Sequence, residues 1–156
     1  MSLAQQIQER LKGILPELMG IQLVEVTPDK VLATKQVRAE LCTTGKILHG
    51  GSIMAFADTL GAVGTFANLQ PGYTTATIES KTNFIGGAAE GTTVTGETTP
   101  VHKGRTTPVW QTRVTNAEGK LGALVTPTQI LMPPRTQARA VKRQVRHRRG
   151  PGGLLG

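Results

Sequence analysis

The stretch HGGSIMAFADT at residues 49–59 decides the fold, because it joins a pair of glycines to a segment that is almost wholly apolar. The apolar character continues to Asn68 and stops before Gln70-Pro71-Gly72, a run typical of a turn. A helix that is apolar all round is usually a buried one. We therefore predict a buried helix over residues 52–68, opened by the glycine pair.

The residues before this helix predict a lead helix and two strands. Residues 3–18 carry Leu or Ile at spacings of three and four, which predicts an amphipathic helix that ends near Pro16. Apolar and polar residues then alternate from Ile21 to Leu41, around the turn-forming run Thr27-Pro28-Asp29-Lys30. This pattern predicts a β-hairpin or two long strands.

Four strand-like segments follow the buried helix, at about residues 74–85, 92–102, 107–116 and 121–132. Pro127 has no N–H to donate, so we expect its strand to lie at a sheet edge or to carry a bulge. The order of helix, two strands, buried helix and four strands predicts an α+β hotdog fold, a mostly antiparallel sheet wrapped around one long helix. This domain spans residues 1–132, with residues 1–18 as its lead helix.

The positive charge is concentrated in a C-terminal tail. The chain has a net charge of +8, but residues 133–156 hold seven Lys and Arg and no acid, which leaves the preceding domain nearly neutral. This tail lacks any strand pattern and is rich in Gly and Pro at its end. We predict that it is disordered, with a short basic helix over residues 136–147 as the alternative.

Composition argues against several classes of protein. A single cysteine, Cys42, cannot form an internal disulfide and fits a reducing compartment. No apolar run approaches the ~18 residues of a membrane span, and charged residues interrupt the N-terminal segment, so we expect a cytoplasmic protein that is not in the membrane. With three histidines and one cysteine, the sequence supports no metal site, and it carries no dinucleotide or phosphate-loop motif. We expect no cofactor.

Two features of residues 49–59 suggest chemistry. Gly50 and Gly51 would leave backbone amides at a helix N-terminus open to a ligand, where an anion is favoured. One such amide aimed at a developing oxyanion contributes roughly 3 kcal/mol. The second feature is Asp58, a carboxylate on an apolar helix, which is costly to bury unless it is paired or used.

The spacing of Gly50 and Asp58 indicates that a shared site needs two chains. They are eight residues apart, which is about 12 Å along a helix axis, too far for both to touch one reacting group. If two such helices pack antiparallel, Asp58 of one chain meets Gly50 of the other. The hypothesis therefore implies a symmetric homodimer with two equivalent sites.

Residues 41–132 resemble the hotdog thioesterases of the phenylacetate-degradation and 4-hydroxybenzoyl-CoA type. The resemblance rests on Gly45-Lys46-Ile47-Leu48-His49-Gly50-Gly51 with the acid at Asp58, on Thr82-Asn83-Phe84, and on Val101-His102-Lys103-Gly104-Arg105 followed by Val109-Trp110-Gln111. It implies hydrolysis of acyl-CoA thioesters, with coenzyme A as part of the substrate. It also implies a homodimer, with a dimer of dimers as the family expectation.

The resemblance implies roles for individual residues. Asp58 matches the catalytic carboxylate, as nucleophile or as general base on water, and Gly50 matches the amide that polarises the thioester carbonyl. His49 helps to set that end of the site, and Thr77 falls where relatives place a hydroxyl that positions water. The implied substrate-binding residues are Gly51, Asn83, Lys103, Gly104 and Arg105. Of these, Lys103 and Arg105 would meet the phosphates of CoA, or would form an ordinary solvated turn.

The chain departs from this pattern at two positions. Thr43 stands where relatives commonly have Asn or Gln six residues before the histidine, and it offers a hydroxyl with shorter reach. Ala62 stands where the aryl-CoA branch often has Ser or Thr. These departures leave the acyl group open between aryl and medium-chain thioesters.

Three other functions remain open on the sequence alone. A hydratase or dehydratase of the same fold would act on similar thioesters but pairs a catalytic histidine with its acid. A non-catalytic acyl-CoA binder of the same fold would account for Thr43 and Ala62, but the presence of Asp58 argues against it. A nucleic-acid binder would use the basic tail, but the tail has no aromatic residue to stack on bases.

Overall fold

The computed structural model describes residues 1–135, which form one antiparallel six-stranded sheet and the helices packed on it. The strand order is β1-β2-β4-β5-β6-β3. The strands are β1 (Ile21–Thr27), β2 (Lys30–Gln36), β3 (Thr74–Phe84), β4 (Thr93–His102), β5 (Val109–Thr115) and β6 (Leu121–Met132). Of the tail predicted as disordered, only residues 133–135 are among the described residues. Its alternative helix at 136–147 lies outside them.

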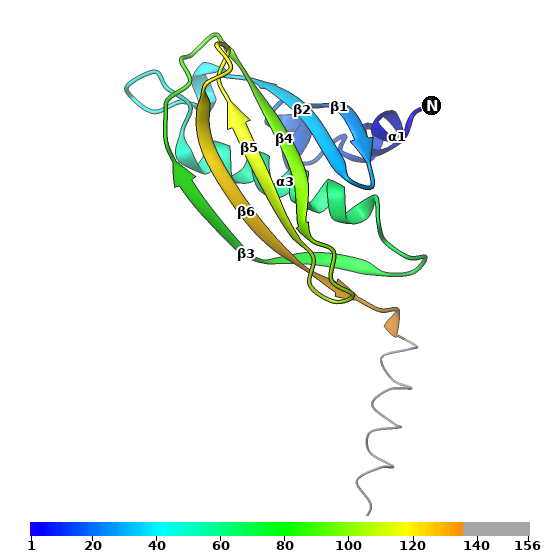
Figure 1. The fold of residues 1–156 in the computed structure, drawn as a ribbon. Helices are drawn as coiled ribbons and strands as arrows, with labels where there is room; N and C mark the ends of the chain where they lie inside the picture. Colours follow the sequence, from blue (N-terminus) through cyan, green and yellow to red (C-terminus); the bar gives the residue numbers. More distant parts are fainter. Residues whose placement is uncertain (136–156) are drawn as a thin grey trace, which may run out of the picture.

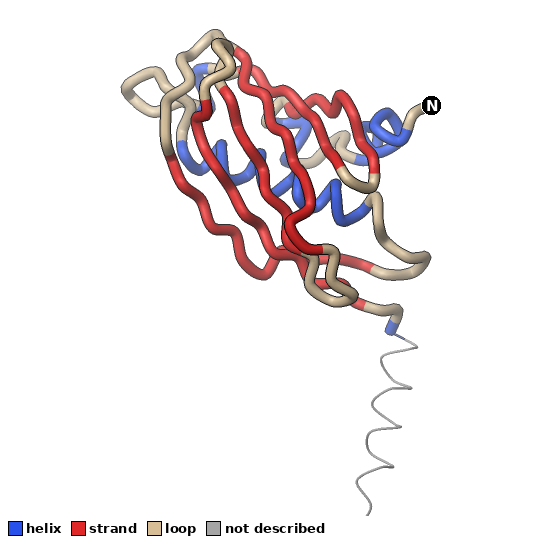
Figure 2. The backbone as a smooth tube through the Cα atoms, viewed as in Figure 1, coloured by secondary structure: helices blue, strands red, loops and turns tan. Residues whose placement is uncertain are grey.

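One long helix, α3 (Gly50–Phe66), lies along one face of the curved sheet, as Figures 1 and 2 show. Its buried side chains include Ile53, Phe56, Leu60 and Val63, and they pack against inward-facing residues of the strands. Gly96 of β4 lets the helix approach closely, because a Cβ there would lie 2.6 Å from a Leu60 methyl carbon. The predicted α+β hotdog fold is confirmed.

The lead segment is two short helices rather than the one predicted helix. Helix α1 (Leu3–Arg10) begins with a capping box between Ser2 and Gln5. Gly13 adopts a positive φ of 75°, which separates α1 from α2 (Leu15–Leu18). The prediction that Pro16 ends the helix is wrong: Pro16 lies in the first turn of α2, where its missing N–H costs no helical hydrogen bond.

The predicted hairpin is confirmed. Of the two settings predicted for Pro127, a sheet edge or a bulge, the sheet edge is wrong. Strands β1 and β2 pair around Thr27 and Lys30, followed by a 3-10 turn, Ala39–Leu41. Pro127 lies in β6, which has β5 on one side and β3 on the other. The irregularity beside it is in β3, whose register with β6 shifts between Thr77 and Glu79.

One face of α3 stays open in the single chain, so the helix is less buried than the sequence predicts. Met54 and Phe66 are each 39% exposed, and Asp58 is half-buried between them. Large apolar side chains on the adjoining edge strand, Ile78 and Phe84, are more than half exposed. Within residues 1–135, no helix is long and apolar enough to cross a membrane.

Candidate active site

The first turn of α3 presents a free backbone amide. His49 is the N-cap residue; its Nδ1 accepts a hydrogen bond from the Gly51 N–H at 2.9 Å, and its carbonyl accepts from the N–H of Ser52. The Gly50 N–H has no hydrogen-bond partner within residues 1–135. A side chain at this position would be crowded, because a Cβ would lie 3.0 Å from the ring of Phe84. The Gly50 amide is therefore available to a ligand.

Asp58 lies two turns further along α3, and β3 holds one of its oxygens. The Thr77 hydroxyl donates a hydrogen bond to Asp58 Oδ1 at 2.7 Å. Asp58 Oδ2 makes no hydrogen bond within the described part of the chain. The carboxylate is thus fixed through one oxygen and has the other free for a reaction.

A buried glutamine orients the Thr77 hydroxyl. Gln129 of β6 is fully buried, and its Nε2 donates to Thr77 Oγ1 at 2.7 Å. Thr75 Oγ1 lies 3.2 Å from Gln129 Oε1 and 3.1 Å from the Ile130 carbonyl. Because Thr77 Oγ1 accepts from Gln129, its own proton is directed to Asp58.

The predicted catalytic residues fall into separate hollows of the single chain. Thr43 and Gly50 line a hollow of about 400 Å³ with Phe84. Asp58 lines another of about 320 Å³, walled by apolar residues of the lead helices and by Ala62 of α3. The fold therefore brings Asp58 to Thr77, and Gly50 to Thr43, but it does not bring Asp58 to Gly50.

His49 and Gly51 face a further hollow of about 340 Å³, next to Ser52 and Cys42. The Gly51 N–H is occupied by the His49 ring, so it is not an open donor as Gly50 is. His49 acts here as the cap that shapes the first turn of α3.

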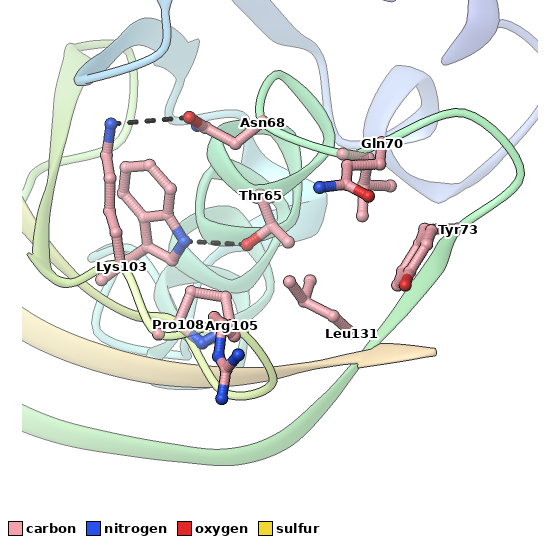
Figure 3. A pocket seen from close by; sticks show the side chains of 11 residues that line it. Thr65, Asn68, Gln70, Tyr73, Lys103, Arg105, Pro108 and Leu131 are labelled. Carbon is pink, nitrogen blue, oxygen red and sulfur yellow. Dashed lines mark hydrogen bonds between the residues drawn. The ribbon is translucent and has the colours of Figure 1, made fainter. Parts of the chain in front are cut away.

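Lys103, Gly104 and Arg105 line a hollow of about 350 Å³ beyond the C-terminal end of α3, shown in Figure 3. Lys103 forms an ion pair with Asp29 at 2.5 Å, and its ammonium lies 3.5 Å from Asn68 Oδ1. Arg105 forms no ion pair within residues 1–135. The free cation in this turn is therefore Arg105.

Asn83 and Trp110, which belong to the motifs of the resemblance, make hydrogen bonds within the domain. Asn83 is exposed near the end of β3, where its Oδ1 accepts a hydrogen bond from Lys81 at 2.9 Å. Trp110 is buried, and its Nε1 donates to Thr65 Oγ1 at 2.8 Å (Figure 3). Residues 1–135 contain no group of three His, Cys, Asp or Glu side chains that could hold a metal ion.

Sequence reasoning missed Gln129 and a buried lysine, Lys35. Gln129 gives little signal, because its importance depends on the register of β3 with β6. Lys35 does give a signal in the sequence, since it occupies an inward position of the alternating run Val31, Ala33, Lys35, Val37. Its ammonium donates to the Ser52 hydroxyl, and burial, with Arg38 nearby, lowers the pKa of Lys35 from 10.5 to about 8.

Comparison with known proteins identifies similar chains. The family model described as the thioesterase superfamily matches residues 45–123. A protein of Deinococcus radiodurans, provisionally named an esterase, is 31% identical over 115 residues, which cover 73% of this chain and 71% of that protein. The 1,4-dihydroxy-2-naphthoyl-CoA hydrolase of Listeria monocytogenes is 26% identical over 107 residues, covering 69% and 86% of the two chains.

The fold is shared with solved thioesterases. The structure of a thioesterase from Haemophilus influenzae superimposes with a TM-score of 0.80 at 23% identity, and covers 85% of this chain and 92% of that one.

Proposed function

The chain belongs to the thioesterase superfamily, and we propose that it hydrolyses acyl-CoA thioesters to the free acid and CoA. The observation that carries the proposal is the Asp58 carboxylate, held through Oδ1 by Thr77 and open at Oδ2, on the same helix as the free Gly50 amide. The CoA hydrolase among its relatives supports this substrate class.

The two halves of the site come from two subunits. Gly50 and Asp58 line different hollows. The two residues are about 12 Å apart along the axis of α3. The open face of α3 and the exposed apolar residues beside it, such as Met54, Phe66 and Phe84, offer a surface for a second copy. An antiparallel pairing of two α3 helices would place Asp58 of each chain near Gly50 of the other, in two equivalent sites. Larger assemblies, such as a dimer of dimers, would repeat this unit.

The proposed chemistry uses the Gly50 amide and the Asp58 carboxylate. The Gly50 N–H donates to the thioester oxygen and stabilises the negative charge that develops there when the carbonyl is attacked. Asp58 Oδ2 either removes a proton from the attacking water or attacks the carbonyl carbon itself. In the second case the carbon–sulfur bond breaks, CoA leaves as the thiolate, and water hydrolyses the resulting anhydride. The same carboxylate serves both routes.

The binding residues also divide by role. Arg105 is suited to the phosphates of CoA, because its guanidinium is free and lies in an exposed turn. Lys103 is engaged with Asp29 and contributes less. The hollow beside Asp58 is walled by apolar side chains, including Leu11 and Ala62, which suits an aryl or medium-chain acyl group.

A panel of aryl- and medium-chain acyl-CoA substrates tests the proposal, with the released thiol detected by a chromogenic disulfide. The wild-type chain should turn over at least one substrate, and Asp58→Asn and Asp58→Ala should each lower kcat by about a hundredfold or more. Circular dichroism should show that both variants are folded. Full activity in either folded variant, or no turnover of any substrate by wild type, would overturn the proposal.

A further inference from the structure

Lys35 is a buried cation without an anionic partner. It lies on β2 with 1% of its surface exposed, and its ammonium lies 5.9 Å from the centre of the Phe56 ring. No carboxylate forms an ion pair with it within residues 1–135. Its hydrogen-bond partner is the hydroxyl of Ser52 on α3. A charge buried in this way is costly, and the fold gains no ion pair in return.

Ser52 belongs to the turn that presents the Gly50 amide. Gly50 and Gly51 have no side chains, so the side-chain hydrogen bonds that hold this turn come from His49 and Ser52. The His49 ring stabilises the turn from within, because it accepts a hydrogen bond from the Gly51 N–H. Ser52 binds it to the sheet, through Lys35. Lys35 is thus the link between β2 and the amide donor.

The charge of Lys35 also lies at the electropositive end of a helix. The N-terminus of α3 carries a partial positive charge, so a cation beneath it destabilises the fold. Arg38 adds a second cation, and Cys42 is the remaining titratable group whose charge acts on Lys35. The same positive field would stabilise an oxyanion bound to the Gly50 amide. An arrangement that costs stability and favours a reaction is typical of an active site.

We propose that Lys35 is a positioning residue for thioester hydrolysis: through Ser52 it holds the turn that carries the Gly50 amide, and its charge strengthens the field at the oxyanion. The inference rests on the proposed function and extends it to a buried pair outside the residues that touch substrate.

Activity and stability should therefore respond to pH in opposite directions. The pKa of Lys35 is about 8 in the folded chain and 10.5 as its ordinary value. Above pH 8 the folded chain loses this proton, and the rate should fall. Between pH 8 and 10.5 the unfolded chain binds more protons than the folded one, so this group makes the free energy of unfolding increase with pH. A lysine with only a structural role would not make the rate fall while the free energy of unfolding rises.

The experiment compares Lys35→Met with wild type and with Lys120→Met, which changes an exposed lysine in a turn. We expect Lys35→Met to lower kcat about tenfold or more, to change KM less than twofold, and to abolish the fall in rate near pH 8. Its Tm at pH 7 should equal or exceed that of wild type, because an unpaired buried charge is removed. Ser52→Ala should also lower kcat, and Ser52→Thr should retain most of it.

The outcomes separate this inference from the proposed function. Turnover that is lost in Asp58→Asn but unchanged in Lys35→Met, with the same pH profile as wild type, would overturn the role of Lys35 alone. No turnover by wild type would overturn the proposed function and, with it, any role of Lys35 in hydrolysis. If Lys35→Met does not fold, Ser52→Ala with an unchanged kcat and pH profile would overturn the inference in its place.

Discussion

At the scale of single residues, the organisation of the site comes from side chains that the sequence places far apart. Asp58 is conspicuous in the sequence as an acid on an apolar helix, and its contact with Thr77 joins α3 to β3. Gln129 is in contact with Thr77 only because β6 pairs with β3 in one register, and no local pattern reveals that. Asp58 could thus be predicted from the sequence, and Thr77 from the resemblance, whereas Gln129, which orients Thr77, could not.

The hydrogen bonds around Asp58 predict a graded series of variants. Thr77→Val removes the donor to Asp58 Oδ1 with little change of shape, and should lower kcat roughly tenfold to a hundredfold. Gln129→Met leaves the Thr77 hydroxyl unoriented, and should lower kcat less. Steady-state kinetics with one acyl-CoA would measure both, with the exposed Thr44→Val as control. Equal activity in Thr77→Val and wild type would show that this hydroxyl does not assist Asp58.

Arg105 and Lys103 should differ in their effect on CoA binding. Arg105→Ala removes the cation that is free of ion pairs in the described residues, and should raise KM for acyl-CoA about tenfold with little change in kcat. Lys103→Ala should have a smaller effect, since Lys103 is engaged with Asp29. Neither change should affect a pantetheine thioester of the same acyl group, which lacks the nucleotide. An equal loss with both substrates would rule out phosphate recognition by Arg105.

At the scale of elements, periodicity predicted the strands well because β2, β4, β5 and most of β6 alternate between buried and more exposed residues. The segment predicted at 121–132 forms β6 with those bounds, and the hairpin turns where Thr27 and Lys30 predict it. The lead helix was predicted as one element because its apolar spacing continues through Gly13. The spacing describes which face is apolar, but the positive φ of Gly13 breaks the helix there. The apolar pattern alone could not predict the open face of α3, because an apolar residue looks the same whether it meets the sheet or another subunit.

Contact between α3 and the sheet predicts a sensitive position on β4. Gly96→Ala would place a Cβ 2.6 Å from a Leu60 methyl carbon and 2.9 Å from the ring of Phe56, so the helix or these side chains must move. Overpacking of this kind costs about 1–3 kcal/mol in the free energy of unfolding. Urea denaturation would measure the loss. Gly45→Ala, whose Cβ would meet its nearest neighbour at 3.6 Å, is the matched control and should change stability little.

At the scale of the whole molecule, the single chain contains both halves of the proposed site but does not join them. Asp58 and its hydrogen-bond partners lie at one hollow, and Gly50 lies at another. The exposed apolar side chains over α3 and β3 include Met54, Phe66 and Phe84. An association through this surface would cover them and complete two sites together.

Placing a charge on this surface should therefore abolish activity together with association. We expect Met54→Lys to shift the chain towards monomer in analytical ultracentrifugation and to lower kcat/KM by at least about a hundredfold. Val24→Lys is the control, since Val24 is an exposed apolar residue on β1, at the opposite edge of the sheet from β3. A fully active Met54→Lys monomer would show that one chain suffices for hydrolysis.

Complementation between two inactive chains tests the shared site most directly. Asp58→Asn removes the carboxylate. Gly50→Pro removes the amide N–H at the first position of a helix, where proline is tolerated. Gly50→Ala keeps the N–H and controls for crowding against Phe84. Asp58→Asn and Gly50→Pro should each be nearly inactive alone. When the two are unfolded together and refolded as a random mixture, half of the dimers are hybrids with one intact site of two, so about a quarter of wild-type activity should return. No recovery from demonstrated hybrids would contradict a site that takes Gly50 from one subunit and Asp58 from the other.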